Sequence, residues 1–345
     1  MLRRIKQIFS EVQSGTAKLL LLAGMLLLVW GTLAPIGTLV WWINQDTESL
    51  TRRNRSRGSS ASDETDAATD APMIDCYIVF FTGVGDFSAD QLAPGEAAFL
   101  DRLVSRHPNC VAVRNVFPYS AANESLGGRR ILAPFWEFAE EADGWLANAD
   151  VLIKIRNLWR MALSIDDRYG SVYNQGIATA VVEQMEAVQP IPDSSSHPLK
   201  LILIGTSGGA QVALGSAHYL DQWLEARLIV VSIGGDFSGG EGFDAVEQVY
   251  HLEGSQDWIE DLGSILFPPR WPWAIGSPVN RAKRQGRFIS IVSGPHEHNG
   301  ARGYFGQTPV PGEDYTYLDL TVQAVNQLPI WSSSENTSLY LEPNL

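Results

Sequence analysis

Short apolar runs alternate with amphipathic stretches over most of the chain. The apolar runs predict strands at residues 74–81, 111–117, 200–204, 228–233, 248–252 and 287–292. The stretches between them predict helices at residues 91–106, 174–187, 210–224 and 258–266. Short apolar strands that alternate with helices indicate a parallel sheet covered on both faces. The sequence therefore predicts an α/β fold, in which functional groups gather at the carboxyl ends of the strands.

A longer apolar segment near the N-terminus has a different pattern. Residues 19–43 contain no charge and, as a helix rising about 1.5 Å per residue, would span a bilayer of about 30 Å with some tilt. Trp41 and Trp42 stand where an interfacial aromatic belt belongs. A cleaved signal peptide would have a shorter apolar core and a small-residue cleavage site. We therefore expect an uncleaved transmembrane anchor behind a basic tail, residues 1–18.

The flanking charges give little information on orientation. Four basic residues precede the apolar segment and four arginines follow it, so the positive-inside rule is evenly balanced. Lys18 abuts the apolar core, whereas the arginines begin several residues beyond it. This difference slightly favours an extracytoplasmic position for the main domain.

Composition divides the rest of the chain. Residues 44–72 are polar without periodicity and predict a flexible linker. An α/β domain is expected at residues 73–328, followed by a C-terminal tail at 329–345. Residues 134–169 are rich in aromatic and aliphatic side chains. They are interpreted either as a cap over an apolar pocket or as a buried helix pair, and the buried pair is favoured.

Charge excludes one class of partner. The chain carries a net charge of -14, of which residues 1–60 hold 8 basic and 3 acidic residues. The remainder therefore has 17 basic and 36 acidic residues, a net of -19. Such an acidic domain repels nucleic acid.

The two cysteines, Cys76 and Cys110, form no metal-binding spacing. Both stand at the start of predicted strands, so a single disulfide is geometrically feasible. We favour two buried small residues, and the redox compartment stays open.

The most informative motif is Gly205-Thr206-Ser207-Gly208-Gly209, which joins an apolar strand to a helix. A tight strand-to-helix turn needs small flanking residues, here Gly205 and Gly209, and lifts its central side chain clear of the sheet. Ser207 is therefore a candidate nucleophile at a helix N-terminus. The alternative is a Gly-Ser loop that only permits close packing.

The loop after the first strand, Thr82-Gly83-Val84-Gly85-Asp86, could supply an oxyanion donor because glycines leave the backbone N–H accessible. The donor stays open between Gly83, Val84 and Gly85, and the second donor would be the N–H of Gly208. A plain β-to-α turn is the alternative.

The acid and the base are expected after the two following strands. Asp257 could orient an imidazole or could cap the helix that begins at residue 258; Glu253 and Asp261 are weaker alternatives. His298 is preferred as the base, with His296 in reserve. A His-x-His metal pair lacks further supporting ligands. The remaining histidines, His107, His197, His218 and His251, are expected to be structural.

The order Ser207, Asp257, His298 resembles that of the α/β-hydrolase superfamily over roughly residues 74–328. The segment 173–219 also looks like that of little-characterised bacterial membrane-associated members. Where the superfamily often has His-Gly in the oxyanion loop, this chain has Thr82-Gly83. The resemblance implies a serine hydrolase that cleaves an ester or thioester, with an acyl-containing small molecule or lipid as substrate and no cofactor. A catalytically silent binding module and an acyltransferase with the same triad are the alternatives.

Overall fold

The structure is a computed structural model and describes residues 74, 76–88, 91–123, 150–191 and 199–331. The chain divides into two units, residues 1–64 and 65–345, and all described residues belong to the second. The expected basic tail, transmembrane helix and linker lie outside the described residues, as do residues 332–345. Within the described part, no helix is both long enough and apolar enough to cross a membrane.

Six parallel strands form one sheet in the order β2-β1-β3-β4-β5-β6. The strands are β1 (Cys76–Phe81), β2 (Cys110–Val113), β3 (Leu199–Thr206), β4 (Ala226–Ile233), β5 (Gln248–Gly254) and β6 (Phe288–Gly294). The chain passes from β1 to β2 on one side and later returns to pair β3 with the other side of β1. In open α/β sheets, ligands bind at the carboxyl ends of strands beside such a reversal.

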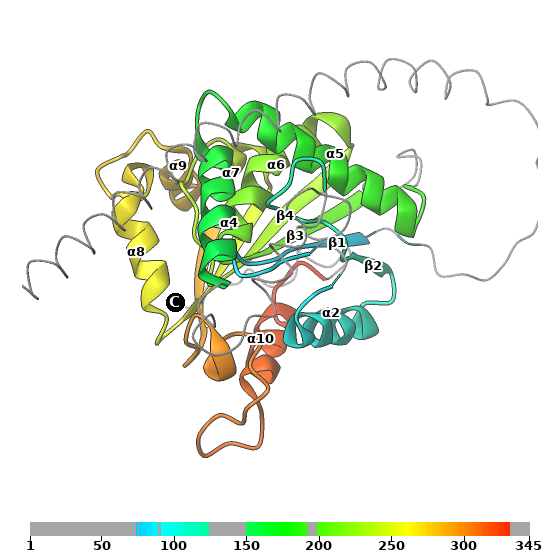
Figure 1. Ribbon diagram of the computed structural model, residues 1–345, viewed down its shortest axis with the longest axis vertical. Coiled ribbons are helices and arrows are strands. Elements are labelled where there is room, and N and C mark those ends of the chain that lie inside the picture. The colour runs from blue at the N-terminus through cyan, green and yellow to red at the C-terminus, as the bar shows by residue number, and fades with distance from the viewer. Residues whose placement is uncertain (1–73, 75, 89–90, 124–149, 192–198, 332–345) are drawn as a thin grey trace, which may run out of the picture. The chain divides into compact units, whose positions relative to one another are not determined.

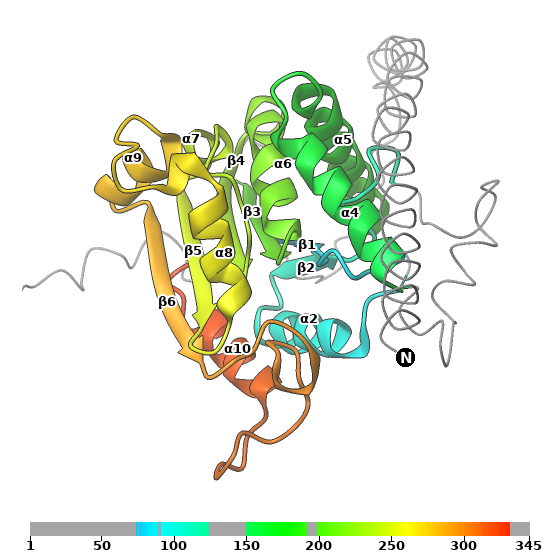
Figure 2. The ribbon, with the colours of Figure 1, turned by 60° about the vertical axis from the view of Figure 1, so that its left-hand side comes forward.

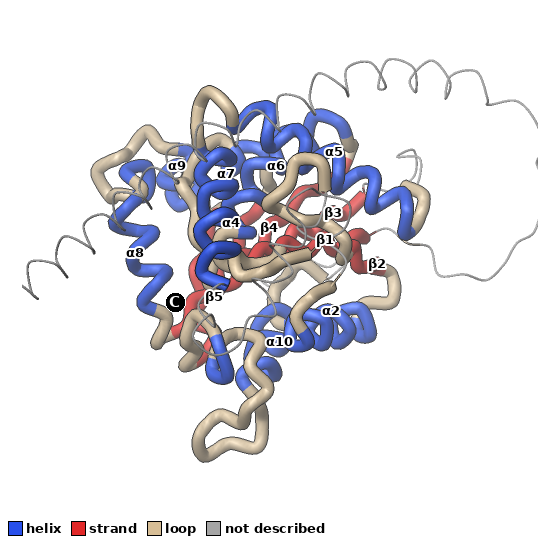
Figure 3. Tube along the Cα trace, viewed as in Figure 1, coloured by secondary structure: helices blue, strands red, loops and turns tan. Residues whose placement is uncertain are grey.

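Helices cover both faces of the sheet (Figures 1 and 3). One face carries α2 (Pro94–Arg106) and α10 (Tyr317–Asn326), which contact each other. On the other side, α6 (Gly209–Trp223) packs on β1, β3 and β4 and contacts a group of helices. These neighbours are α4 (Asp150–Ile165), α5 (Gly170–Val188) and α7 (Gly242–Ala245). Between β5 and β6 lie α8 (Trp258–Leu266), the 3-10 turn η2 (Pro268–Arg270) and α9 (Pro278–Arg284), and a second such turn, η3 (Gly300–Arg302), follows β6.

The core beneath α2 and α10 follows the alternation of the strands. Ile78 and Phe80 of β1 belong to it, together with Ile202 and Ile204 of β3, and all four side chains are fully buried. Successive side chains of a strand point to opposite faces, so the intervening residues serve the layer beneath α6. Burial on both faces explains why these strands have continuous apolar sequences.

The predicted α/β fold with a parallel sheet is confirmed, and the differences are local. The second strand ends at Val113 instead of reaching residue 117, and beyond it Phe117 N donates to Asn123 Oδ1 rather than to a neighbouring strand. Helices α7, α9 and α10 were not among the predicted ones. Packing also extends to Trp331, which stacks on His107 with ring centroids 3.7 Å apart.

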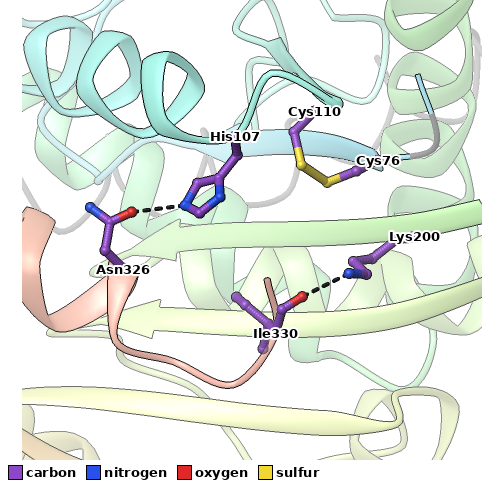
Figure 4. Close-up of a disulfide and its surroundings, with 6 residues drawn as sticks. All are labelled: Cys76, His107, Cys110, Lys200, Asn326 and Ile330. Atoms are coloured by element: carbon purple, nitrogen blue, oxygen red, sulfur yellow. Dashed lines mark hydrogen bonds between the residues drawn. A yellow bond between two sulfur atoms is a disulfide. The ribbon is translucent and has the colours of Figure 1, made fainter. Parts of the chain in front are cut away.

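The expectation of two unlinked cysteines was wrong, because Cys76 and Cys110 form a disulfide (Figure 4). The register of the parallel pair places these two residues directly opposite each other, with Cα atoms 4.3 Å apart. The bond joins the edge strand β2 to β1. Beside it, Lys200 Nζ donates to the carbonyl of Ile330 over 2.8 Å and fixes the C-terminal segment to the sheet.

Candidate active site

Ser207 stands on a strained turn between β3 and α6. It adopts a positive φ of 50°, which non-glycine residues rarely do. Its carbonyl accepts hydrogen bonds from the N–H groups of Ala210 and Asp236, over 3.1 and 3.0 Å. A Cβ on Gly205 would lie 2.5 Å from the Ala210 Cα, and one on Gly209 would lie 2.4 Å from the Phe81 carbonyl oxygen. Both glycines are therefore required by close backbone approach, as the motif predicted.

The structure brings Ser207, His298 and Asp257 together, although they come from three separate loops. His298 Nε2 lies 3.0 Å from Ser207 Oγ. The other ring nitrogen, Nδ1, lies 3.0 and 2.9 Å from the two carboxylate oxygens of Asp257. The Asp257 side chain is fully buried and that of His298 is 8% exposed. This geometry lets an imidazole accept the serine proton while a carboxylate stabilises the imidazolium.

Asp257 both contacts the imidazole and caps a helix. It is the N-cap of α8, and its Oδ1 accepts a hydrogen bond from Ile259 N over 3.1 Å. Burial by itself raises the pKa of Asp257, but the hydrogen bond and charge of His298 and the hydrogen bond from Tyr304 together hold it below its ordinary value. The carboxylate is therefore kept ionised beside the imidazole.

Tyr304 is a site residue that the sequence interpretation missed. Its hydroxyl donates to Asp257 Oδ2 over 2.8 Å and accepts from Gly254 N, also over 2.8 Å. The side chain is almost fully buried. Tyr304 thus connects the end of β5 to the carboxylate. No local motif marks it, since its partners lie about fifty residues away in the chain.

His296, the reserve candidate for the base, lies elsewhere. Its ring is fully buried and stacks on the Tyr304 ring, with centroids 4.8 Å apart. Burial lowers the pKa of His296 to about 4. His296 therefore packs behind the triad as a neutral ring, and its backbone carbonyl accepts from Gln256 N over 3.2 Å.

The other weighed alternatives are also outside the triad. Glu253 Oε1 accepts a short hydrogen bond from Ser290 Oγ and lies 3.6 Å from His251 Nε2. His251 is buried, with Nδ1 2.9 Å from Ser232 Oγ. The side chain of Asp261 and the whole of His197 lie outside the described part. Among the described residues, no group of three His, Cys, Asp or Glu side chains could hold a metal ion.

The loop after β1 approaches the nucleophile, as expected from pairing of β1 with β3. A Cβ on Gly83 would lie 3.5 Å from the Ser207 Cβ, and one on Gly208 would lie 2.7 Å from Val84 Cγ1. The backbone of residues 83–84 and the first turn of α6 therefore flank the Ser207 side chain. The assignment of Val84 and Gly208 as oxyanion donors, with Gly83 or Gly85 in place of Val84, stays a prediction.

Asn157 of α4 holds this loop in place. Its Nδ2 donates to the carbonyls of Val84 and Asp86, over 2.9 and 2.8 Å, and its Oδ1 accepts from Arg156 Nη1 over 2.7 Å. The side chain is fully buried. Helix α4, which lies in the described part of segment 134–169, therefore supports the loop directly.

Replacing Asn157 by alanine is expected to slow acylation of Ser207 by roughly 10- to 100-fold, because a small displacement of preorganised donors is costly. Binding of a small acyl probe should change little, so the loss should fall on the acylation rate constant. Asn280→Ala is the matched control, since Asn280 Nδ2 likewise donates to backbone carbonyls, those of Pro269, Trp271 and Ala274. Equal rate losses in the two variants would contradict a specific role for Asn157.

Asp86 ends the same loop with its carboxylate partly withdrawn from water. Its Oδ2 is fully shielded from solvent, and burial raises its pKa to about 6, although Thr82 acts in the opposite direction. Burial and the nearby charge of Asp86 also raise the pKa of Glu96 well above its ordinary value. The two acids, on the loop and on α2, therefore retain protons that exposed carboxyl groups would release.

The pKa of Asp86 is higher in the folded chain than in the unfolded chain, so its protonated carboxyl group stabilises the fold at low pH. This contribution is lost as the pH rises through about 6. Asp86→Asn should therefore gain about 2–3 kcal/mol relative to the unsubstituted chain between pH 4 and pH 7.5. Thermal unfolding at both pH values measures this, with Asp314→Asn as a control for the change in net charge. A stability difference independent of pH would contradict the prediction.

Comparison with known proteins adds no constraint to this geometry. No protein-family model matches the chain, and no curated protein matches it either.

Proposed function

We propose that this chain is a serine hydrolase of the α/β-hydrolase type that cleaves an ester or thioester. The observation that carries the proposal is the continuous set of contacts from Ser207 Oγ to His298 Nε2 and from His298 Nδ1 to Asp257. A glycine-flanked serine with positive φ, in contact with a histidine that a buried carboxylate orients, supports covalent catalysis.

In the proposed reaction, Ser207 Oγ attacks the acyl carbon while His298 Nε2 takes the hydroxyl proton. The oxyanion is held by backbone N–H groups of residues 83–84 and of Gly208. The tetrahedral intermediate collapses, His298 gives its proton to the leaving alcohol or thiol, and an acyl-enzyme remains. Water then attacks the acyl carbon, again losing its proton to His298, and the proton returns to Ser207 as the acid is released.

We further propose that the domain is attached to a membrane and lies on its extracytoplasmic side. The uncharged segment 19–43 supports the attachment. The disulfide between Cys76 and Cys110 supports an oxidising compartment, in which structural disulfides persist. This agrees with the slight preference from the charges flanking the apolar segment.

Labelling of the full-length, detergent-solubilised chain with a fluorophosphonate tests the hydrolase. We expect one covalent adduct on the peptide that contains Ser207, absent from heat-denatured protein and from Ser207→Ala. Ser232 provides an internal comparison, because it lies 2.9 Å from His251 Nδ1 but is fully buried, whereas Ser207 is half-buried, so Ser232 should remain unlabelled. An unlabelled folded chain would overturn the proposal and favour the catalytically silent binding module instead.

A further inference from the structure

Helix α8 begins directly after Asp257, and this helix and the loop that follows it carry six large apolar side chains that are exposed. They are Trp258, Leu262, Ile265 and Leu266 of α8, and Trp273 and Ile275 of the loop, and we call these six residues the apolar face. Trp258 is 64% exposed and Trp273 is 72% exposed. Single exposed apolar side chains are ordinary, but a cluster of this kind marks an interaction surface.

The apolar face results from a fixed orientation of α8. Its four exposed members are spaced four, seven and eight residues from the first, so they lie along one side of the helix. An adjacent side of the helix is held by Gly263, where a Cβ would lie only 1.7 Å from Asp236 Oδ1. Because α8 packs this closely on the domain, it cannot rotate to bury its apolar side without losing that contact.

The loop is equally well fixed. Asn280 Nδ2 donates to the carbonyls of Pro269, Trp271 and Ala274, over 2.7 to 3.1 Å. Trp271 Nε1 donates to the Ile265 carbonyl over 3.0 Å and so ties the loop to α8. The exposed Trp273 and Ile275 are therefore displayed by a rigid support. Figure 2 shows α8 and α9, which flank this loop, on the same side of the sheet.

From Leu262 onwards this surface displays almost no charge, whereas Glu260 and Asp261 lie on α8 between Trp258 and Leu262. Between Leu262 and Ile275 the only charged residue is Arg270. Its guanidinium is 6% exposed, lies 3.9 Å from Asp236 Oδ1 and stands 4.4 Å from the centre of the Phe237 ring. The single cation is therefore turned inward, and indole, proline and aliphatic groups remain outside.

We infer that the apolar face inserts into the interfacial layer of a lipid bilayer. Tryptophan with aliphatic side chains on a short amphipathic helix is the composition that suits this layer. The inference rests on the proposed membrane attachment, since residues 19–43 would hold the domain within the length of a polar linker from the bilayer. A second copy of the chain is a poorer fit, because residues 61–345 carry a net charge of -19 and would repel each other.

Insertion would also orient the site. Asp257 directly precedes Trp258 and is the N-cap of α8, so the triad begins where the apolar face begins. The bilayer would then lie beside Trp258, which directly follows the carboxylate of the triad. The substrate class that follows is an acyl lipid presented at a membrane surface.

The test uses the full chain with Ser207→Ala, so that its outcome does not depend on catalysis. Ile275→Cys, labelled with an environment-sensitive fluorophore, reports on the apolar face, because the two native cysteines are already bonded. Glu225→Cys is the matched control, since it is exposed, directly precedes β4 and does not belong to the apolar face. Both are reconstituted with phosphatidylcholine vesicles that carry bromine on the acyl chains.

We expect at least about twofold quenching of the label at position 275 and little at position 225. Adding Trp258→Ser and Ile265→Ser should reduce the quenching at position 275 while the chain stays bound to the vesicles. Equal quenching at both positions, or none at 275, would overturn the inference. A lipid-independent change that grows with protein concentration would overturn it in favour of a second copy.

Discussion

His298→Ala is expected to slow acylation of Ser207 by about 10⁴-fold or more, because no group then takes the hydroxyl proton as Ser207 Oγ attacks. His298 Nε2, at 3.0 Å, is the only imidazole nitrogen within hydrogen-bonding distance of Ser207 Oγ among the described residues. The measurement is the second-order rate constant of fluorophosphonate labelling. The labelling rate that remains in His298→Ala should be no greater than the oxyanion donors can support without a general base.

His296→Ala is the matched comparison, since it removes an identical side chain from the same loop. His296 contacts the Tyr304 ring rather than Ser207, so we expect a rate loss below about tenfold. The cavity left by a fully buried ring should instead cost about 2–4 kcal/mol of folding free energy. A large rate loss in His296→Ala with normal labelling of His298→Ala would reverse the assignment of the base.

Gly209→Ala is expected to destabilise the fold more than any other single methyl addition to the elbow. The new Cβ would lie 2.4 and 2.5 Å from the carbonyl oxygens of Phe81 and Thr82, which belong to the backbone and cannot move aside alone. We expect a loss of about 3 kcal/mol or more, which lowers the unfolding midpoint by roughly 6–12 °C in a domain of this size. Labelling should fall as well, because the clash displaces the loop after β1.

Gly276→Ala adds the same methyl group where no atom lies within 4 Å. Its unfolding midpoint and labelling rate should match those of the unsubstituted chain. Comparable losses in both variants would show that backbone freedom, rather than the close approach of β1 to α6, makes Gly209 necessary.

Local sequence was sufficient for the sheet and the elbow because both depend on short-range patterns. The strands are buried on both faces, so each stands out as an apolar run. The elbow requires small residues at fixed positions, and these are visible as Gly205 and Gly209. The order of the triad could also be predicted, since each member follows a strand of a parallel sheet.

What could not be predicted depended on contacts between distant segments. His296 and His298 are two residues apart, and only the path of their loop past β5 decides which ring reaches Ser207. The supporting residues Tyr304 and Asn157 act through hydrogen bonds to loops that are far away in the sequence. The two interpretations of Asp257 were not exclusive, because a carboxylate has enough lone pairs to cap a helix and bind an imidazole together.

The Cys76–Cys110 bond has a consequence for how the domain resists self-association. Strand β2 is an edge strand whose register with β1 contains only four residue pairs. A ladder this short frays readily, and fraying would bare the N–H and C=O groups of β1 to a strand from another molecule. The covalent link keeps β2 in place even when its hydrogen bonds open. At this edge of the sheet, the disulfide rather than a long hydrogen-bonded strand therefore protects the domain against strand exchange and aggregation.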